Sequence, residues 1–178
     1  EPSLVVCDPA KHAAISAIAA KHGAAVETLD SHGKGSLYDK AQAASAAFAN
    51  AQRGPDDLAA ILYTSGTTGR SKGAMLSHDN LASNSLSLQQ YWRFTSHDVL
   101  IHALPIYHTH GLFVATNVML FAGGSMIFLP KLDAEAILRV MPRATAMMGV
   151  PTFYTRLLAH PGLTREATKH MRLFISGS

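Results

Sequence analysis

The sequence has 178 residues, 48% hydrophobic and 15% charged, which is enough for one domain with a sizeable core covered on both faces of a sheet. Its net charge of +3 is spread along the chain, which argues against nucleic-acid binding. The single cysteine, Cys7, excludes an internal disulfide and fits a reducing compartment. The longest apolar segment, 112–122, is too short to span a bilayer. We therefore expect a soluble, cytoplasmic protein.

The first 57 residues predict a βαβ unit, then a second helix and a linker. Asp8-Pro9 is typical of a helix start, and Gly23 of a helix end. The second helix is alanine-rich, with Leu37 and Phe48 at the two ends of one apolar face. Residues 52–57, which contain Gly54-Pro55, predict a linker that could divide the domain. The expected elements are strand 4–7, helix 10–22, strand 25–29 and helix 37–51.

The rest of the chain alternates strands with helices, which predicts a mostly parallel sheet with helices on both faces, a layered αβα fold. Ser77 is a favourable N-cap, and Pro105 and Pro151 mark element boundaries. The expected elements are strand 58–63, a short strand or turn at 73–76, helix 79–92, strand 98–104, helix 108–122, strand 125–129, helix 133–141, strand 145–150, helix 151–159 and strand 172–175.

A loop rich in glycine and hydroxyl residues follows the apolar run 58–62. Glycines let backbone N–H groups form a concave anion site, to which hydroxyls and a lysine add donors. Strand, loop and helix in this order indicate phosphate binding. The spacing excludes a P-loop, because Ser71 precedes Lys72 and Gly73 follows it, and there is no Rossmann G-x-G-x-x-G. The candidate nucleotide-binding residues are Thr64, Ser65, Gly66, Thr67, Thr68, Gly69 and Lys72.

In such α/β sheets, ligands bind beyond the carboxyl ends of the strands. The phosphate loop, the segment at His108 and the segment at Pro151 each follow a predicted strand. We therefore expect all three segments to meet at one cleft.

Two stretches carry a family resemblance. YTSGTTGRSKGAMLSH (residues 63–78) resembles the phosphate-loop signature YTSGTTGxPKGVxxxH of the adenylate-forming superfamily, with Ser71 where proline is common. LPIYHTHG (residues 104–111) is similar to that family's LPxFHxxG. The superfamily includes acyl- and aryl-CoA synthetases, peptide-synthetase adenylation domains and luciferases. The resemblance implies that residues 1–178 are an excerpt of the large N-terminal ATP- and acyl-binding domain. We expect the C-terminal domain to be absent, so that these residues alone are inactive.

The resemblance also implies a reaction. A carboxylate and ATP form an acyl-adenylate and pyrophosphate, and the thiol of CoA then gives a thioester. The phosphate loop would hold ATP, and Thr64 matches a position that helps to bind Mg²⁺ in some family members. His108 matches the position beside the acyl carboxylate and the thiol tunnel, where it would orient the carboxylate. His108 and His110 have no third ligand nearby, so we reject a zinc site.

The substrate is indicated by the segments around His108 and Pro151. Residues 107–110 contain no carboxylate to hold an ammonium group, which disfavours an amino acid. Thr152 and Arg156, four apart on the helix that Pro151 begins, share one face, and an arginine suits a second substrate carboxylate. LPIYHTHGL with VPTFYTRL looks like the malonyl-CoA synthetase branch. The expected substrate-binding residues are His108, His110, Thr152 and Arg156.

Other functions stay open at this point. The ligase could act on another short-chain or aryl acid, or the chain could be a noncatalytic nucleotide-binding module. A phosphotransferase with an altered P-loop would need an acidic residue at a strand end in the Walker-B manner, and we find none.

Overall fold

The computed structural model describes residues 2–64 and 72–177. Contacts divide the chain into two compact units, Glu1–Gln52 and Arg53–Ser178. The boundary falls at the start of the predicted linker, 52–57. Within the described ranges no helix is long and apolar enough to cross a bilayer.

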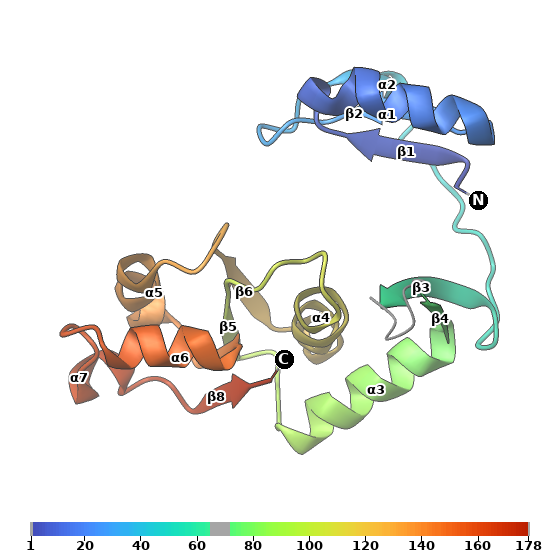
Figure 1. Ribbon diagram of the computed structural model, residues 1–178. Coiled ribbons are helices and arrows are strands. Elements are labelled where there is room, and N and C mark those ends of the chain that lie inside the picture. The colour runs from blue at the N-terminus through green and yellow to red at the C-terminus, as the bar shows by residue number, and fades with distance from the viewer. Residues whose placement is uncertain (1, 65–71, 178) are drawn as a thin grey trace. The chain divides into compact units, whose positions relative to one another are not determined.

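The first unit contains the expected βαβ arrangement (Figure 1). Strands β1 (Leu4–Cys7) and β2 (Ala25–Thr28) pair in parallel, as predicted. The helix between them has a 3₁₀ turn at each end of α1 (His12–Ala19). Gly23 ends it with a φ of 66°, a left-handed conformation that glycine adopts without strain.

The second helix of this unit is shorter than predicted. Helix α2 spans Ser36–Ala43, because Ala44 is already extended. The predicted helix 37–51 was therefore wrong over its second half, where Phe48 is 82% exposed instead of packed. Ser36 and Lys40, which both bind the carboxylate of Glu27 on β2, anchor the part that does form. Alanine-rich sequence alone makes a marginal helix without a surface to pack on.

The second unit begins with an antiparallel hairpin of β3 (Leu58–Thr64) and β4 (Lys72–Ser77). Helix α3 (His78–Tyr91) follows β4, and Ser77 forms a reciprocal capping box with Asn80. Strand β3 is thus joined to another strand, and not directly to a helix. The stretch at 73–76, predicted as a short strand or turn, is a strand that pairs with β3 before α3 begins.

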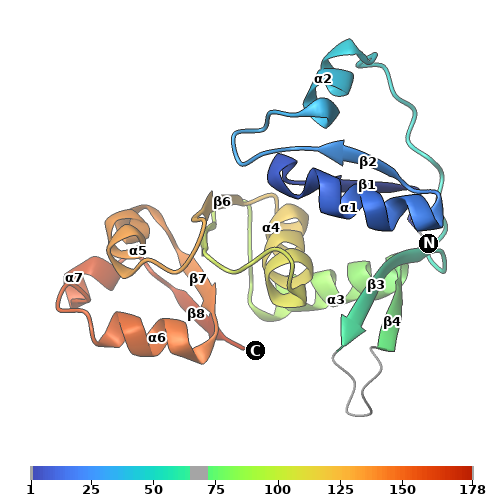
Figure 2. The ribbon, with the colours of Figure 1, turned by 45° about the horizontal axis from the view of Figure 1, so that its top comes forward.

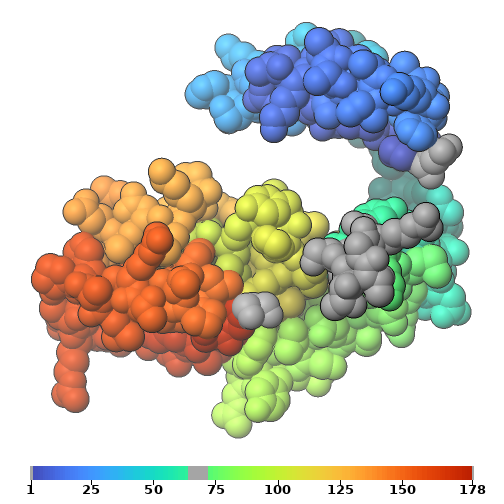
Figure 3. All heavy atoms as spheres, viewed as in Figure 1, coloured from blue at the N-terminus to red at the C-terminus, as the bar shows by residue number. Residues whose placement is uncertain are grey.

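Four parallel strands form the main sheet, in the order β6-β5-β7-β8. Helices α3 and α4 lie on one face and α5 and α6 on the other, which gives the expected αβα layers (Figures 1 and 2). Figure 3 shows the view of Figure 1 with all heavy atoms drawn as spheres. The strands are β5 (Val99–His102), β6 (Ser125–Phe128), β7 (Ala146–Gly149) and β8 (Leu173–Ser176); the helices are α4 (Asn117–Ala122), α5 (Ala134–Val140), α6 (Pro151–Leu158) and α7 (Arg165–Thr168).

Two helical features differ from the prediction. Residues His110–Thr116, the start of the expected helix 108–122, form a π-helical segment before α4. The short helix α7 was not predicted. Strands β5 and β7 are buried on both faces, as their apolar sequences require: Leu100, Ile101 and Met147 have no exposed surface.

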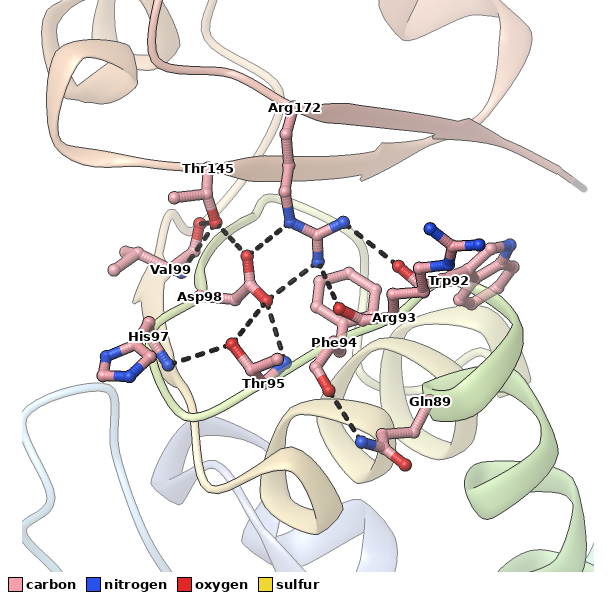
Figure 4. Close-up of polar contacts among 10 residues, drawn as sticks. All are labelled: Gln89, Trp92, Arg93, Phe94, Thr95, His97, Asp98, Val99, Thr145 and Arg172. Atoms are coloured by element: carbon pink, nitrogen blue, oxygen red, sulfur yellow. Dashed lines mark hydrogen bonds and ion pairs between the residues drawn. The ribbon is translucent and has the colours of Figure 1, made fainter.

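An ion pair between the buried Asp98 and the exposed Arg172 lies at the amino-terminal ends of three strands (Figure 4). The carboxylate of Asp98, just before β5, accepts hydrogen bonds from Nε and Nη2 of Arg172 at 2.7 and 2.8 Å. Thr145, just before β7, and the Thr95 N–H add bonds of 2.7 and 2.8 Å. Burial alone would raise the pKa of Asp98, but these hydrogen bonds outweigh it and hold the pKa well below its usual range.

Candidate functional site

The largest described cavity lies at the carboxyl ends of β5, β6 and β7, where ligands bind in open parallel sheets. It has a volume of about 820 Å³ and a mostly apolar wall. The segment that contains His108 and the start of α6 both contribute to it, so these two predicted segments do meet. Its lining residues are Ala103, Leu104, Pro105, Ile106, Tyr107, His108, Phe128, Leu129, Pro130, Lys131, Leu132, Val150 and Phe153.

A second cavity, of about 340 Å³, involves the next residues of the same segment, Thr109 and His110. It also involves the end of β8, where Ser176 and Gly177 contribute a hydroxyl and backbone groups. Its lining residues are Leu88, Trp92, Thr109, His110, Val114, Ile175, Ser176 and Gly177. The segment 105–111 therefore contributes to two cavities, with His108 at the larger one and His110 at the smaller one.

The backbone of this segment is held by short-range hydrogen bonds. The His108 N–H donates to the Pro105 carbonyl at 3.2 Å, and the Leu112 N–H donates to the His108 carbonyl at 2.9 Å. The side chain of His108 is exposed, and its ring centroid is 4.9 Å from that of Tyr107. An exposed imidazole on a fixed backbone can orient an incoming ligand.

His110 is half-buried beside the end of β8. Burial lowers the pKa of its imidazole, and a hydrogen bond with the Gly177 backbone opposes this only in part. Since a histidine pKa is ordinarily about 6.5, the ring is mainly neutral at pH 7 and acts as a hydrogen-bonding group, not as a cation.

The predicted phosphate loop is only partly visible. Ser65, Gly66, Thr67, Thr68 and Gly69 lie outside the described residues. Thr64, the last residue of β3, and Lys72, the first residue of β4, are paired in the hairpin. Because β3 lies outside the parallel sheet, the expectation that the loop follows a strand of that sheet was wrong. The roles of these residues stay predictions.

Thr152 and Arg156 share α6, as expected, but both are exposed and neither lines a described cavity. The buried positions of the helix are Phe153 and Leu157. This placement does not support a direct contact between Arg156 and an acid in either cavity, and the role stays a prediction.

Two side chains near the site, Lys131 and Tyr154, were not predicted from the sequence. Lys131, three residues beyond β6, is the one Lys or Arg among the residues that line the larger cavity. Its place after a predicted strand was a usable signal. The Tyr154 hydroxyl donates to the Ile175 carbonyl at 2.5 Å and lies 3.2 Å from the Met147 carbonyl, so it ties α6 to β7 and β8. Nothing local in the sequence indicates that contact.

The described residues contain no group of three or more His, Cys, Asp and Glu side chains that could hold a metal ion. Neither set of cavity-lining residues contains an Asp or a Glu. The cavities therefore suit an anionic or neutral ligand better than an ammonium group.

Comparison with known protein families identifies the class. The family model for AMP-binding enzymes matches residues 1–178, so the chain belongs to that family. This confirms the resemblance and the fold class predicted from the sequence.

Several malonate–CoA ligases are among the similar proteins. The chain is 37% identical over 143 residues to a malonate–CoA ligase of Arabidopsis thaliana, which covers 69% of this chain and 24% of that protein. It matches the ATP-bound crystal structure of MatB from Rhodopseudomonas palustris with a TM-score of 0.96 and 74% identity, over 99% of this chain and 35% of that one. A malonyl-CoA ligase with methylmalonyl-CoA and AMP bound matches at 32% identity and a TM-score of 0.75, over 99% and 36% of the two chains. The chain thus spans about a quarter of the length of the curated relatives it matches.

Proposed function

We propose that these residues are part of the N-terminal ATP- and acid-binding domain of an AMP-forming ligase that converts malonate to malonyl-CoA. The observation that carries the proposal is the 74% identity to ATP-bound MatB over 99% of the chain. The geometry agrees with it, since a segment with two histidines lies at the ligand-binding edge of the sheet between two cavities.

The acid binds beside the turn 105–111, which borders both cavities. Polar residues line the smaller cavity: Thr109, His110 and Ser176. Small anionic ligands are held by a few such groups in an otherwise apolar wall. The single N–H of a neutral His110 has the Gly177 backbone as its partner, so the ring lines this cavity without the desolvation cost of a buried cation.

The polyphosphate of ATP binds the loop from Thr64 to Lys72. Donors on this loop hold the phosphates while the substrate carboxylate attacks the α-phosphorus and pyrophosphate leaves. Lys72 offsets the charge of the departing pyrophosphate. Mg²⁺ usually binds through one or two protein groups together with substrate phosphates, which fits a chain without an acidic cluster among its described residues. Thr64 is the group proposed to assist it.

His108 orients the carboxylate and then the acyl-adenylate for the second step. In that step the sulfur of CoA bonds to the acyl carbon, the bond from that carbon to the AMP oxygen breaks, and the thiol proton is released. Thr152 and Arg156 remain candidates for a second substrate carboxylate. Because both side chains are exposed, this geometry favours an indirect effect on the substrate, transmitted through α6.

We further propose a reducing compartment, with the cytoplasm as the expected one. The support is the single cysteine, Cys7, which is free and partly buried in β1. Fractionation of the source cells with an antibody to the protein tests this directly.

The test of function is pyrophosphate–ATP exchange by the full-length protein with a panel of acids. Malonate should support the fastest exchange, and acetate, succinate and benzoate should support much slower exchange. Exchange that is equally fast with all four acids, or fastest with benzoate, would remove malonate as the substrate. No exchange with any of the four acids would favour a noncatalytic nucleotide-binding module.

A further inference from the structure

His102, the last residue of β5, is 1% exposed and has no part in the function proposed above. The strand residues before it, Leu100 and Ile101, are apolar and fully buried. A histidine in such a place carries two polar nitrogen atoms into the core. Buried polar groups are costly unless their hydrogen bonds are satisfied, so its contacts call for a physical reason.

One ring nitrogen of His102 contacts the segment that bears the site histidines. Nε2 lies 2.9 Å from the Gly111 carbonyl oxygen and 3.2 Å from the Thr116 hydroxyl. The Thr116 hydroxyl donates to the same Gly111 carbonyl at 2.9 Å. A carbonyl oxygen accepts two hydrogen bonds, so we assign the proton to Nε2 as the second donor. The Gly111 carbonyl is therefore fixed from two sides.

Gly111 is the point at which the segment closes on itself. A Cβ atom there would lie 2.3 Å from the Pro105 carbonyl oxygen, so no side chain fits without a backbone shift. Residues 105–111 form a closed turn whose two ends touch. A fixed Gly111 therefore fixes the backbone that carries His108 and His110.

The other contacts of His102 lead to the cavity wall. Its ring stacks on Phe128, which lines the larger cavity, with centroids 4.6 Å apart and planes at 28°. Nδ1 has no hydrogen-bond partner among the described residues. Nε2 therefore bonds to Gly111, while Nδ1 is a buried polar atom without a hydrogen bond to the described part of the chain. A leucine at this position would not leave a buried polar atom unsatisfied. The energetic cost of the unsatisfied Nδ1 has a physical reason if the Nε2 hydrogen bond keeps the turn 105–111 in place.

We propose that His102 is a positioning residue for acid activation, which holds the turn 105–111 in register through the Gly111 carbonyl. This inference rests on the function proposed above. Its contact is indirect: the imidazole touches neither cavity, and acts through the backbone that carries His108 and His110. Misplacement of a reacting group by about 1 Å costs rate more than binding, on the order of 100-fold.

Three substitutions separate the Nε2 bond from simple packing. His102→Gln puts an amide N–H near the place of Nε2, His102→Asn puts it near Nδ1, and His102→Met keeps the volume without a donor. In malonate-dependent exchange, the Asn and Met variants should lower kcat roughly 10- to 100-fold with an unchanged KM for ATP. The Gln variant should recover kcat to within about threefold of the parent, since the donor is restored.

Thr145→Val is the matched control, because it loses a half-buried hydroxyl at the amino-terminal end of β7, the strand next to β5. It should lower thermal stability and leave kcat unchanged. If His102→Met keeps the parental kcat, or if His102→Gln is as slow as His102→Met, the positioning role is wrong.

Hydrogen–deuterium exchange gives a readout that does not need activity. In the full-length protein, His102→Met should speed deuterium uptake in peptides that cover 105–113, whereas Thr145→Val should leave those peptides unchanged. Equal uptake in parent and His102→Met would overturn the inference. If the parent shows no malonate-dependent pyrophosphate–ATP exchange, but the variants differ in deuterium uptake as described, the proposed function is wrong and His102 remains the residue that orders the turn.

Discussion

His108 and His110 are two residues apart, yet they line different cavities. The turn that ends at Gly111 separates them, because its backbone bonds leave His108 exposed and place His110 beside Gly177. Two chemically similar side chains can thus serve different parts of a reaction. His110, whose pKa burial lowers, is a neutral ring bonded to the Gly177 backbone, while His108 stays accessible to solvent.

The two family motifs could be recognised from the sequence because a binding loop depends on local spacing, whereas the roles of their residues stay predictions. His108 and His110 were placed at the ligand-binding edge of the sheet in the same way. Which side chains line the cavities was harder to predict from the sequence. Arg156 was expected at the acid, but the direction of a helical side chain depends on how the whole helix packs. Lys131, in the loop after β6, was overlooked because it belongs to neither motif.

Lys72 tests the phosphate-binding assignment. Lys72→Ala should lower pyrophosphate–ATP exchange roughly 100-fold, since one charged donor to the departing group is lost. Thioester formation from a pre-formed malonyl-adenylate and CoA should change little. Lys21→Ala, at an exposed lysine of the first unit, is the control. A Lys72→Ala protein with parental exchange would contradict a phosphate role.

Arg156 tests how malonate is distinguished from acetate. As the candidate for the second carboxylate of malonate, Arg156 should set this preference, so Arg156→Ala should lower the ratio of kcat/KM for malonate to that for acetate by roughly 100-fold or more. Arg165→Ala, at an exposed arginine on α7, is the control. A ratio that stays within about threefold of the parent would show that Arg156, which is exposed on α6, stays solvated and adds no discrimination.

At the scale of elements, most strands and helices matched their predicted ranges within two or three residues. The exceptions have physical causes. Helix α2 stops early because nothing covers its expected second half, and Phe48 stays in solvent. The hairpin of β3 and β4 was not foreseen because pairing across a loop depends on tertiary contacts, which local sequence patterns do not encode.

Tyr154 tests the join between α6 and the strands that end at the site. Burial raises the pKa of its phenol to about 12, although the hydrogen bond with Ile175 opposes this. Tyr154→Phe should lower the free energy of unfolding by about 1–2 kcal/mol, because the Ile175 carbonyl loses its donor. The raised pKa means that the phenol contributes its full stability below about pH 10 and loses it as the pH rises toward 12.

Urea denaturation of the full-length protein at pH 8 measures this change. Tyr91→Phe is the matched control, since Tyr91 on α3 is 82% exposed and should cost almost nothing. Equal stability of the two variants would show that the Tyr154 hydroxyl does not hold β8.

At the scale of the whole molecule, the two edges of the parallel sheet have separate tasks. The carboxyl ends form the cavities, and the amino ends are fixed by Asp98 and Arg172 (Figure 4). Arg172 also reaches the Trp92 and Arg93 carbonyls at 3.1 and 3.2 Å, so the pair joins the end of α3 to the sheet. These contacts at the amino ends involve none of the residues that line the larger described cavity at the carboxyl ends.

Asp98→Asn should destabilise the protein by about 2–3 kcal/mol at pH 7, because Arg172 loses its charged partner. The lowered pKa also gives a pH signature. Its stability is present above the unfolded value near 4 and is lost as the pH falls through the folded value, so the parent should weaken from about pH 5 downward.

Thermal unfolding of the two full-length proteins between pH 7 and pH 3 measures both effects. The gap in Tm between parent and Asp98→Asn should narrow as the pH falls. A gap that stays constant over this range would mean that the Asp98 carboxylate is not held ionised by its neighbours.

The products of one reaction test the proposed ligase activity most directly. Full-length protein incubated with ATP, Mg²⁺, malonate and CoA should form malonyl-CoA, AMP and pyrophosphate in equal amounts, as measured by mass spectrometry and nucleotide chromatography. Omission of malonate should stop AMP formation. ADP in place of AMP, or AMP without a malonyl thioester, would contradict the proposed ligase.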